Sequence, residues 1–383
     1  MDVKNKKVFV GMSGGVDSSV AAMMLKNEGY DVTGVFMRCY NVDGCQDRDA
    51  EDARRVAEHL GIPFYVWDFE EDYKKRVVEY MVEGYRAGIT PNPDVMCNRE
   101  IKFGLFFDKA LAAGADYIAT GHYVRLERDL KTENCKLKIA KDLGKDQSYF
   151  LWTLTQEQLA HCLFPIGDHV KPEVRAMAKK AGLPTADKKD SQGICFLGQV
   201  SIEDFLKAYI PEKRGALVTT AGENIGEHFG AQFYTIGQRH IDADFKFPKT
   251  GGAVERQPFY VAAKDVATNV VTLAEGDENE ALYKKEIELV GVHFIDPDHR
   301  IIRANEPINV LARVRYRQPL TTARIMKQEA GSKNDAEAKY ILLFEKPQKF
   351  VAAGQSAVFY SADGPSFAKA SKGMEMLGGG VIL

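Results

Sequence analysis

The chain has 383 residues, and its 51 Lys and Arg against 54 Asp and Glu leave a formal net charge of −3. This balance excludes a protein coated in positive charge, so binding to nucleic acid would need basic side chains gathered on one face. A hydrophobic share of 45% with 27% charged residues excludes a disordered or fibrous chain, and the length predicts two or three domains. No apolar run is long enough for a membrane span and no signal peptide pattern is present, so we expect a cytoplasmic protein without a membrane partner.

Six cysteines lie at positions 39, 45, 97, 135, 162 and 195, without a C-x-x-C pair or a His cluster at finger spacing. A disulfide scaffold and a structural zinc site are therefore not expected. The usual role of a single cysteine in a reducing compartment is that of a small buried apolar residue. We assign no further role to Cys39, Cys45, Cys135 and Cys162.

The first half of the chain alternates short apolar runs with amphipathic stretches. Strands are predicted over residues 8–10, 32–37, 64–67 and 117–120, and helices over 17–27, 49–60 and 99–113. This alternation with short connections predicts an α/β domain, in which helices cover both faces of a parallel sheet. Ligands of such sheets bind beyond the carboxyl ends of the strands. Residues 11–18, Met37 and residues 120–122 should therefore share one rim.

The pattern changes after about residue 200. A capped helix is predicted near Ser201, and a glycine-rich region of short β pattern extends to about residue 280. Further strands are predicted over residues 308–314, 321–326, 339–344 and 356–360. Short strands at this spacing indicate a small barrel or sandwich. We therefore expect a catalytic domain over residues 1–200, a small central domain over 201–283 and a β domain over 284–383.

The loop after the first predicted strand reads G-M-S-G-G-V-D-S-S from Gly11 to Ser19. Glycines let a backbone approach a phosphate closely, and a helix N-terminus favours a bound anion. The segment matches neither the P-loop nor the dinucleotide fingerprint. Its S-G-G-x-D-S string resembles the pyrophosphate loop of the N-type ATP pyrophosphatases, which split ATP between the α- and β-phosphates. The alternative is a glycine-rich turn without a ligand.

Two residues near this loop have open roles. Met37 ends the second predicted strand and could contact an adenine, although a core methionine is an equal interpretation. Gly121 could let a ribose or an adenine approach, or it could simply form a turn.

A second informative segment is N-P-D-V-M-C-N-R-E-I-K-F, from Asn92 to Phe103. Prolines at positions 91 and 93 are expected to stop a helix, and Asn98 is expected to cap the next one. Cys97 would then lie just ahead of a helix N-terminus, where a thiolate is stabilised. Asp94 could act as an acid or base, or bind a base edge.

The third segment is D-S-Q-G-I-C-F-L, from Asp190 to Leu197, and it suggests that Cys195 is presented from a loop. Taken singly, Cys97 and Cys195 are more readily explained as structural cysteines. Their combination with the phosphate-type loop favours a function for both.

Three arginines at positions 313, 315 and 317 alternate along a predicted strand, so they should line one face with Tyr316 on the other. Such a face could contact RNA phosphates, or it could be a solvated barrel face.

Six segments together carry a closer resemblance. They are G-M-S-G-G-V-D-S-S, P-N-P-D-x-x-C-N-x-x-I-K-F, A-T-G-H-Y, K-D-Q-S-Y-F-L, S-Q-G-I-C-F and Y-T-I-G-Q-R-H, in this order over most of the chain. The set resembles the bacterial tRNA-specific 2-thiouridylases, which are members of the N-type ATP pyrophosphatase superfamily. The resemblance implies a parallel-sheet ATP pyrophosphatase domain (adenine nucleotide alpha hydrolase-like), a small central domain and a C-terminal β-barrel.

The resemblance also implies roles for residues that match the family's motifs. ATP would be bound by Gly11, Met12, Ser13, Gly14, Gly15, Val16, Asp17, Ser18, Met37 and Gly121. Asn92, Pro93 and Asp94 would surround the target uracil, with Asp94 also catalytic. Cys97 would be the nucleophile and Cys195 the persulfide carrier, and the two would form a transient disulfide. The tRNA would be contacted by His122, Lys145, Asp146, Gln147, Arg315, Tyr316 and Gln355.

The activity that the resemblance implies is ATP-dependent 2-thiolation of the wobble uridine of tRNA, with ATP and Mg²⁺ required. Some relatives carry a third cysteine where this chain has Asp94, and an iron–sulfur cluster is associated with those; Asp94 therefore implies no cluster here. The implied partners are the anticodon loop of the Lys, Glu and Gln acceptors and a sulfur donor, either a cysteine desulfurase or a sulfur-relay protein. The alternative is a synthetase with the same loop that adenylates another small or RNA substrate and needs no paired cysteines.

Overall fold

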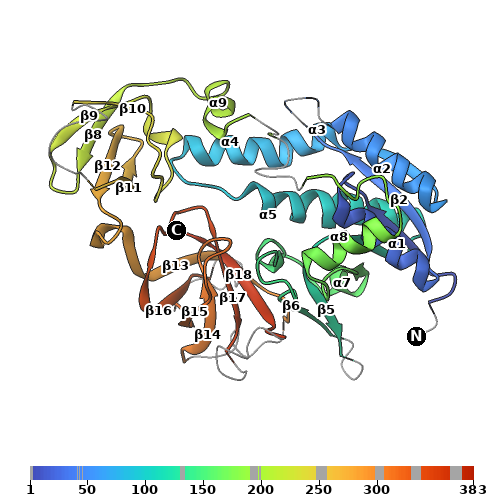
Figure 1. Ribbon diagram of the computed structural model, residues 1–383. Helices are drawn as coiled ribbons and strands as arrows, with labels where there is room; N and C mark the ends of the chain where they lie inside the picture. Colours follow the sequence, from blue (N-terminus) through green and yellow to red (C-terminus); the bar gives the residue numbers. More distant parts are fainter. Residues whose placement is uncertain are drawn as a thin grey trace.

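The computed structural model describes residues 3–40, 42, 44, 46–129, 134–189, 197, 200–246, 257–297, 306–328, 338–362 and 373–383. The first half of the chain forms an α/β domain, a small β domain follows, and a barrel ends the chain (Figure 1). In Figure 1 helix α4 extends from the α/β domain toward the small β domain, and the barrel lies beside these two domains. The expected fold class is confirmed.

The sheet of the α/β domain is parallel, with the strand order β3-β2-β1-β4-β7 among the described residues. The strands are β1 Lys7–Gly11, β2 Asp31–Arg38, β3 Phe64–Asp68, β4 Tyr117–Thr120 and β7 Cys162–Leu163. Gly11 pairs with both Val35 and Thr120, so the carboxyl ends of β1, β2 and β4 meet at one edge. The chain order reverses beside β1, which is where open α/β sheets bind ligands.

Two separate apolar clusters cover the two faces of this sheet. Val8 and Val10 of β1 pack with helices α1 (Val16–Glu28), α2 (Gln46–Leu60) and α8 (Lys171–Lys180). The intervening Phe9 packs against the other cluster, which contains Met81 and Phe106. This alternation follows from the two-residue side-chain period of a strand, and it confirms a sheet with helices on both faces.

Two long composite helices cover the second face. The first consists of α3 (Glu70–Tyr73), the π-helical segment η1 (Lys74–Val78) and α4 (Glu79–Arg86), none of which the sequence pattern predicted. The second consists of α5 (Pro93–Cys97), the π-helical segment η2 (Asn98–Leu105) and α6 (Phe106–Ala112). The helix predicted over residues 99–113 therefore begins at Pro93. Stretches of π-helix are rare and occur frequently at functional sites.

Shorter elements complete the α/β domain and lead to the next one. They are the hairpin β5 (Arg125–Arg128) and β6 (Cys135–Lys138), η3 (Ser148–Phe150), α7 (Gln156–Ala160) and α9 (Ile202–Lys207). The predicted cap of α9 is confirmed, because Ser201 Oγ accepts a hydrogen bond from Asp204 N at 3.0 Å.

The small β domain is one sheet of order β10-β9-β8-β12-β11. Its strands are β8 Gly215–Thr219, β9 Asn224–His228, β10 Ala243–Phe245, β11 Phe259–Asp265 and β12 Val270–Glu275, with the short helix η4 at Ala231–Phe233. The C-terminal domain, after η5 at Glu280–Leu282, is a closed antiparallel barrel of order β13-β16-β15-β14-β17-β18. Its strands are β13 Tyr283–Phe294, β14 Ile308–Arg313, β15 Thr321–Lys327, β16 Tyr340–Lys349, β17 Ser356–Ser361 and β18 Met376–Ile382.

The expected arginine face on the barrel is wrong. Strand β14 ends at Arg313, and Arg317 has a φ of 65°, so the three arginines do not lie along one strand. Arg313 is buried, Arg315 is half-buried and Arg317 is exposed. The chain turns after Arg313, and the two-residue period that the prediction assumed does not continue.

Arg313 instead joins the barrel to the α/β domain. Its Nη2 donates to Asp146 Oδ2 at 2.5 Å and to the Tyr360 hydroxyl at 2.7 Å. Ser148 Oγ donates to the same carboxylate at 2.9 Å, and Ala140 N donates to its other oxygen at 3.1 Å. Asp146 and Arg313 are both buried. This buried polar network fixes the barrel against the segment that contains residues 145–151.

In the described part of the chain, no helix has both the length and the apolar character needed to cross a membrane.

Candidate active site

The phosphate-type loop lies at the sheet edge predicted for it. Met12 N donates to Val35 O at 2.8 Å, which extends the sheet past β1, and Gly15 is the N-cap of α1 without a side-chain capping bond. The first N–H groups of α1 are thus left for another acceptor, and the positive end of the helix dipole favours an anion there. Gly14 has a φ of 71°, and an added Cβ would lie 2.2 Å from Asp49 O, so only glycine fits.

The two serines of the loop hold its shape. Ser13 N donates to Ser18 Oγ at 3.2 Å, and the Ser18 hydroxyl lies 3.2 Å from Gly15 O. Both hydroxyls face each other at 3.3 Å. Met12 is fully buried, so its predicted contact with ATP stays a prediction.

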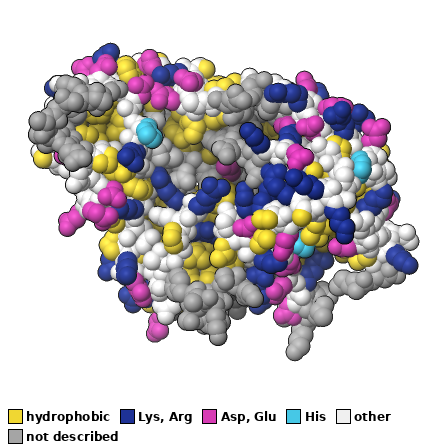
Figure 2. All heavy atoms as spheres, in the orientation of Figure 1, with side chains coloured by type: hydrophobic (Ala, Val, Ile, Leu, Met, Phe, Trp, Pro, Cys, Tyr) yellow, Lys and Arg dark blue, Asp and Glu magenta, His cyan; other side chains and the backbone are white. Residues whose placement is uncertain are grey.

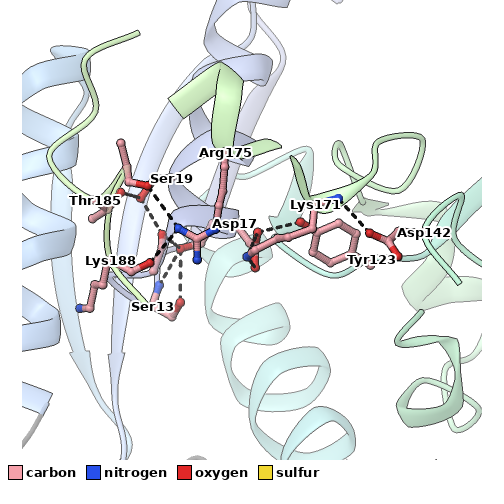
Figure 3. A network of polar contacts seen from close by, with 12 residues as sticks. Ser13, Asp17, Ser19, Tyr123, Asp142, Lys171, Arg175, Thr185 and Lys188 are labelled. Atoms are coloured by element: carbon pink, nitrogen blue, oxygen red, sulfur yellow. Dashed lines mark hydrogen bonds and ion pairs between the residues drawn. The ribbon is translucent and has the colours of Figure 1, made fainter. Parts of the chain in front are cut away.

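Asp17, in the first turn of α1, is held by two side chains from distant segments (Figure 3). Lys171 Nζ lies 2.8 Å from each of its carboxylate oxygens, and the Tyr123 hydroxyl donates to Oδ1 at 2.9 Å. The Lys171 backbone N–H in turn donates to Asp142 Oδ2 at 2.9 Å. Sequence reasoning missed Lys171, because it lies 154 residues from Asp17 and no local motif marks it.

The chain after α8 packs against the same loop. Thr185 Oγ1 donates to Ser19 Oγ at 3.0 Å, and Arg175 donates to the carbonyl of Lys188 at 3.0 Å (Figure 3). The Lys188 ammonium forms ion pairs with Asp49 at 2.7 Å and Asp52 at 2.6 Å. The carboxylates around the loop are therefore neutralised by lysines that sequence reasoning did not connect to them.

Gly121 and Met37 lie beside the loop, as expected from the sheet topology. A Cβ on Gly121 would lie 2.6 Å from Ser18 N and 2.8 Å from Asp17 C, so the glycine is needed for close packing against the start of α1. Met37 is half-buried, and its Cε lies 3.0 Å from the place that a Cβ on Gly11 would take. These contacts give Gly121 and Met37 a role in packing. Their contact with the nucleotide stays a prediction.

The expected position of Cys97 is wrong. Asn92 caps the helix, with its Oδ1 accepting from Val95 N at 3.2 Å, and Pro93 occupies the first helical position. Asn98 has helical dihedrals of −62° and −48° and continues the helix. Cys97 therefore lies inside the composite helix, where no helix N-terminus stabilises its thiolate. Proline is found both at the first turn of a helix and just after its end. The prediction placed Pro93 after a helix, whereas it begins one.

Burial dominates the electrostatics of this segment. It raises the pKa of the Asp94 carboxyl and the pKa of the Cys97 thiol. The positive charge of Lys102 opposes burial at both groups, and a hydrogen bond with Tyr73 further lowers the pKa of Cys97. Burial thus makes the Asp94 carboxyl and the Cys97 thiol hold their protons more tightly than exposed groups would, and the charge of Lys102 acts on both.

His122 is a neutral buried imidazole. Its Nδ1 lies 2.8 Å from Thr120 Oγ1, and its ring packs near those of Phe103 and Phe164. Burial lowers its pKa well below the usual value, and the charge of Lys102 lowers it further. Since His122 follows Gly121 directly, Lys102 connects the rim of the nucleotide loop with the cysteine helix.

Other residues predicted to contact tRNA bond within the protein in this conformation, and Asp146 and Gln355 do so across domains. Asp146 faces Arg313 and not solvent, and Gln147 Oε1 accepts from Tyr123 N at 2.9 Å. Gln355 of the barrel donates to Thr90 O at 2.9 Å and Pro91 O at 3.1 Å, which fixes the chain just before Asn92.

Two further residues predicted to contact tRNA are partly exposed, and two of the cysteines lie outside the described residues. Lys145 and Tyr316 are half-buried, and the Tyr316 ring packs on Phe150 with centroids 4.4 Å apart. Cys195, the predicted persulfide carrier, lies outside the described residues, as does Cys45. Cys135 and Cys162 are buried and burial raises the pKa of each thiol, as expected for structural cysteines.

Comparisons with known proteins give one consistent result. Family descriptions match in chain order: a tRNA methyl transferase HUP domain over residues 6–199, a tRNA methyl transferase PRC-barrel domain over 203–275 and an aminomethyltransferase beta-barrel domain over 284–382. A relative from Enterococcus faecalis, named tRNA-specific 2-thiouridylase MnmA, is 42% identical over 100% of this chain and 96% of its own length. Relatives with the same name from Streptococcus pyogenes and Bacillus pumilus are 43% and 42% identical, over 98% and 99% of this chain and 95% of theirs. With full-length identity at this level, the chain belongs to the tRNA-specific 2-thiouridylase family.

Proposed function

We propose that this protein is an ATP-dependent sulfurtransferase that converts the wobble uridine of tRNA to 2-thiouridine. The observation that carries the proposal is that two sites lie close together, because the charge of Lys102 acts on Asp94 and Cys97 and also on His122, which follows Gly121 at the rim of the loop. One is the uncapped N-terminus of α1 with its glycine loop, and the other is the Asp94–Cys97 pair. Membership in a family whose members are named tRNA-specific 2-thiouridylase supports this assignment.

The loop serves the activation half of the reaction. The O2 of uracil is a poor leaving group, and transfer of AMP to it makes it a good one. The free N–H groups at α1 are suited to hold the pyrophosphate that this step releases. No three His, Cys, Asp or Glu side chains gather as a metal site in the described ranges. We propose that Mg²⁺ arrives with the ATP phosphates, whose oxygens it prefers, and offsets their charge.

The cysteines serve the sulfur half of the reaction. Cys195 would carry a persulfide, and the Cys97 thiolate would attack its inner sulfur. A Cys97–Cys195 disulfide then forms, hydrosulfide leaves and adds to C2 of the activated uracil, and AMP departs with the former O2. A thiol reductant supplies the two electrons and two protons that restore both thiols. We propose no iron–sulfur cluster, because Asp94 stands where cluster-associated relatives have a third cysteine.

Asp94 is suited to proton transfer at the base. A carboxyl whose pKa is raised by burial holds its proton closer to neutral pH than an exposed one, so it can donate to a leaving oxygen and take the proton back. The target base must also leave its stack to reach a buried thiol, which favours the single-stranded anticodon loop over a helix. A cysteine desulfurase or a relay protein would supply the sulfur, in the cytoplasm.

The test is mass spectrometry of nucleosides from unmodified tRNA incubated with the protein, ATP, Mg²⁺ and a persulfide source. We expect 2-thiouridine with the native protein and none with Cys97→Ala or Cys195→Ala. Cys135→Ala, in a buried cysteine without an assigned role, is the matched control and should retain activity. Pyrophosphate release without any thiolated nucleoside, unaffected by either alanine variant, would contradict the proposal and favour an adenylating synthetase.

A further inference from the structure

Two half-buried cations near Tyr85 lie where the three domains meet. Lys264, on β11 of the small domain, has its Nζ 5.8 Å from the centre of the Tyr85 ring. Arg315, in the turn after β14 of the barrel, interacts electrostatically with the same tyrosine, which belongs to α4 of the α/β domain. The three domains thus contribute one side chain each.

Both cations are held by the same short segment of backbone. Lys264 Nζ donates to Tyr234 O and Arg315 Nη2 donates to Ile236 O, each at 2.6 Å. Two residues of chain span at most about 7 Å, so the two charged groups lie within roughly 12 Å of each other. The segment is itself fixed, because Gly237 N donates to Val261 O at 2.7 Å and its α-carbon packs on Phe350.

Neither cation has a carboxylate partner among the described residues. Burial lowers the pKa of both side chains, that of Lys264 to about 8, and the pKa of Arg315 is raised in return only by Tyr149 and Tyr85, with no described carboxylate acting on either cation. Other buried cations of the described chain are neutralised: Lys171 faces Asp17, and Arg313 faces Asp146. A buried charge without a counter-charge is unfavourable, so this pair is better explained by an anionic ligand than by packing.

The pair also has donors left for a ligand. An ammonium has three N–H donors and a guanidinium five, and one bond from each is recorded, to a backbone carbonyl. Figure 2 shows a hollow between the small domain and the barrel, with Lys and Arg side chains along its edge.

We propose that Lys264 and Arg315 together bind a backbone phosphate of the tRNA, so that the small domain takes part in holding the substrate. The inference rests on the proposed function and extends it to Lys264, which no motif of the sequence marked. A phosphate diester fits because it brings one negative charge and two free oxygens to two cations that approach from different domains. Binding there would add an RNA-mediated link to the direct contact that Arg315 already makes with Ile236 of the small domain.

The test compares tRNA affinity as a function of KCl concentration for the native protein and four variants. Lys264→Met removes the charge, Lys264→Gln removes the charge but keeps a donor for Tyr234 O, and Lys264→Arg keeps the charge. Lys246→Met is the matched control, because Lys246 is exposed beside β10, at the opposite edge of the same sheet. Removing one phosphate contact should reduce the slope of log affinity against log salt by about 0.7–0.9 and weaken binding by roughly threefold to tenfold.

We expect both Lys264→Met and Lys264→Gln to show this loss, while Lys264→Arg and Lys246→Met resemble the native protein. If Lys264→Gln keeps the native tRNA affinity and the native salt slope, Lys264 only holds the Tyr234 carbonyl and the proposal is overturned. Inorganic phosphate is titrated against the same proteins. If the Lys264→Met and Lys264→Gln variants lose phosphate binding but keep native tRNA binding, the site belongs to a free anion and the proposal is overturned. A native protein that fails to bind tRNA would instead contradict the proposed function, and ATP binding measured in parallel separates the two failures.

Discussion

Lys171 Nζ lies 2.8 Å from both carboxylate oxygens of Asp17, and the pair closes one side of the glycine loop. Asp17 lies in the first turn of α1, next to the N–H groups proposed to hold pyrophosphate. An unpaired carboxylate there would repel a triphosphate, and the repulsion would be strong because Lys171 and Asp17 are largely shielded from water. Lys171 therefore neutralises the Asp17 carboxylate, so that the loop can bind the negatively charged phosphates of ATP.

Replacing Lys171 with Met should weaken ATP binding about tenfold or more, because it leaves the Asp17 charge beside the phosphates. AMP lacks the β- and γ-phosphates, so its affinity should change much less. Calorimetric titration with both nucleotides measures the difference. Lys179→Met, in an exposed ion pair on the same helix, is the control. Equal losses for ATP and AMP would indicate a general structural defect and contradict the electrostatic role.

Gly121→Ala should distort the start of α1, since the new Cβ would lie 2.6 Å from Ser18 N. Crowding of this kind costs about 1–3 kcal/mol of stability, and the distortion should also weaken ATP binding. Thermal unfolding and ATP titration test both effects. Gly144→Ala is the matched control, because its nearest neighbour is a carboxylate oxygen of the Asp142 side chain at 3.4 Å. Native ATP affinity in Gly121→Ala would show that the loop tolerates the shift.

The sequence was most informative where local chemistry determines local structure. The glycines of residues 11–15 are needed between a strand and a helix whatever the rest of the chain does, and that segment was predicted correctly. The fold class followed from the alternation of strands and helices for the same reason.

Prediction failed where the outcome depends on distant contacts. Pro93 is compatible with either end of a helix, and the packing of α5 against the sheet domain decides for the beginning. Nothing near Arg313 indicates that it turns toward Asp146, 167 residues away. Lys171 and Lys264 were missed because each acts on partners that only the tertiary fold brings near.

Arg313→Met should destabilise the docking of the barrel. It leaves the Asp146 carboxylate buried without its cation, and breaking a buried pair in this way costs about 3–5 kcal/mol. The double variant Arg313→Met/Asp146→Asn removes the stranded charge and should recover part of the loss. Urea unfolding measures these differences. Arg324→Met, on an exposed position of β15, should change stability by about 0.5 kcal/mol or less. A similarly small effect at Arg313 would mean that the network does not hold the barrel.

Lys102→Met should slow alkylation of Cys97 at any pH near neutral. Burial already raises the pKa of this thiol, and the lysine charge opposes that rise. Without Lys102 the pKa should rise further, so a smaller fraction of the thiol is present as the reactive thiolate. Iodoacetamide incorporation into the Cys97 peptide, followed by mass spectrometry across a pH series, measures the change. Lys109→Met is the control, because the Lys109 ammonium lies over the Trp67 ring. Faster alkylation of Cys97 in Lys102→Met would refute the role assigned to Lys102.

The affinity for tRNA should fall between pH of about 7 and 9 in the native protein. Burial lowers the pKa of Lys264 to about 8, so its ammonium is mostly charged at the lower pH and mostly neutral at the higher one. The neighbouring Tyr85 and Tyr234 have raised pKa values and stay neutral throughout, and Arg315 stays charged.

Lys264→Arg keeps its charge across this range and should lose most of the pH dependence, while Lys264→Met should start weak and stay weak. Fluorescence anisotropy with labelled tRNA at constant ionic strength measures all three curves. An unchanged pH profile in both variants would assign the titration to another group. A profile that disappears only in the variants would show that the charge of Lys264, rather than its hydrogen bond to the Tyr234 carbonyl, is what the RNA detects.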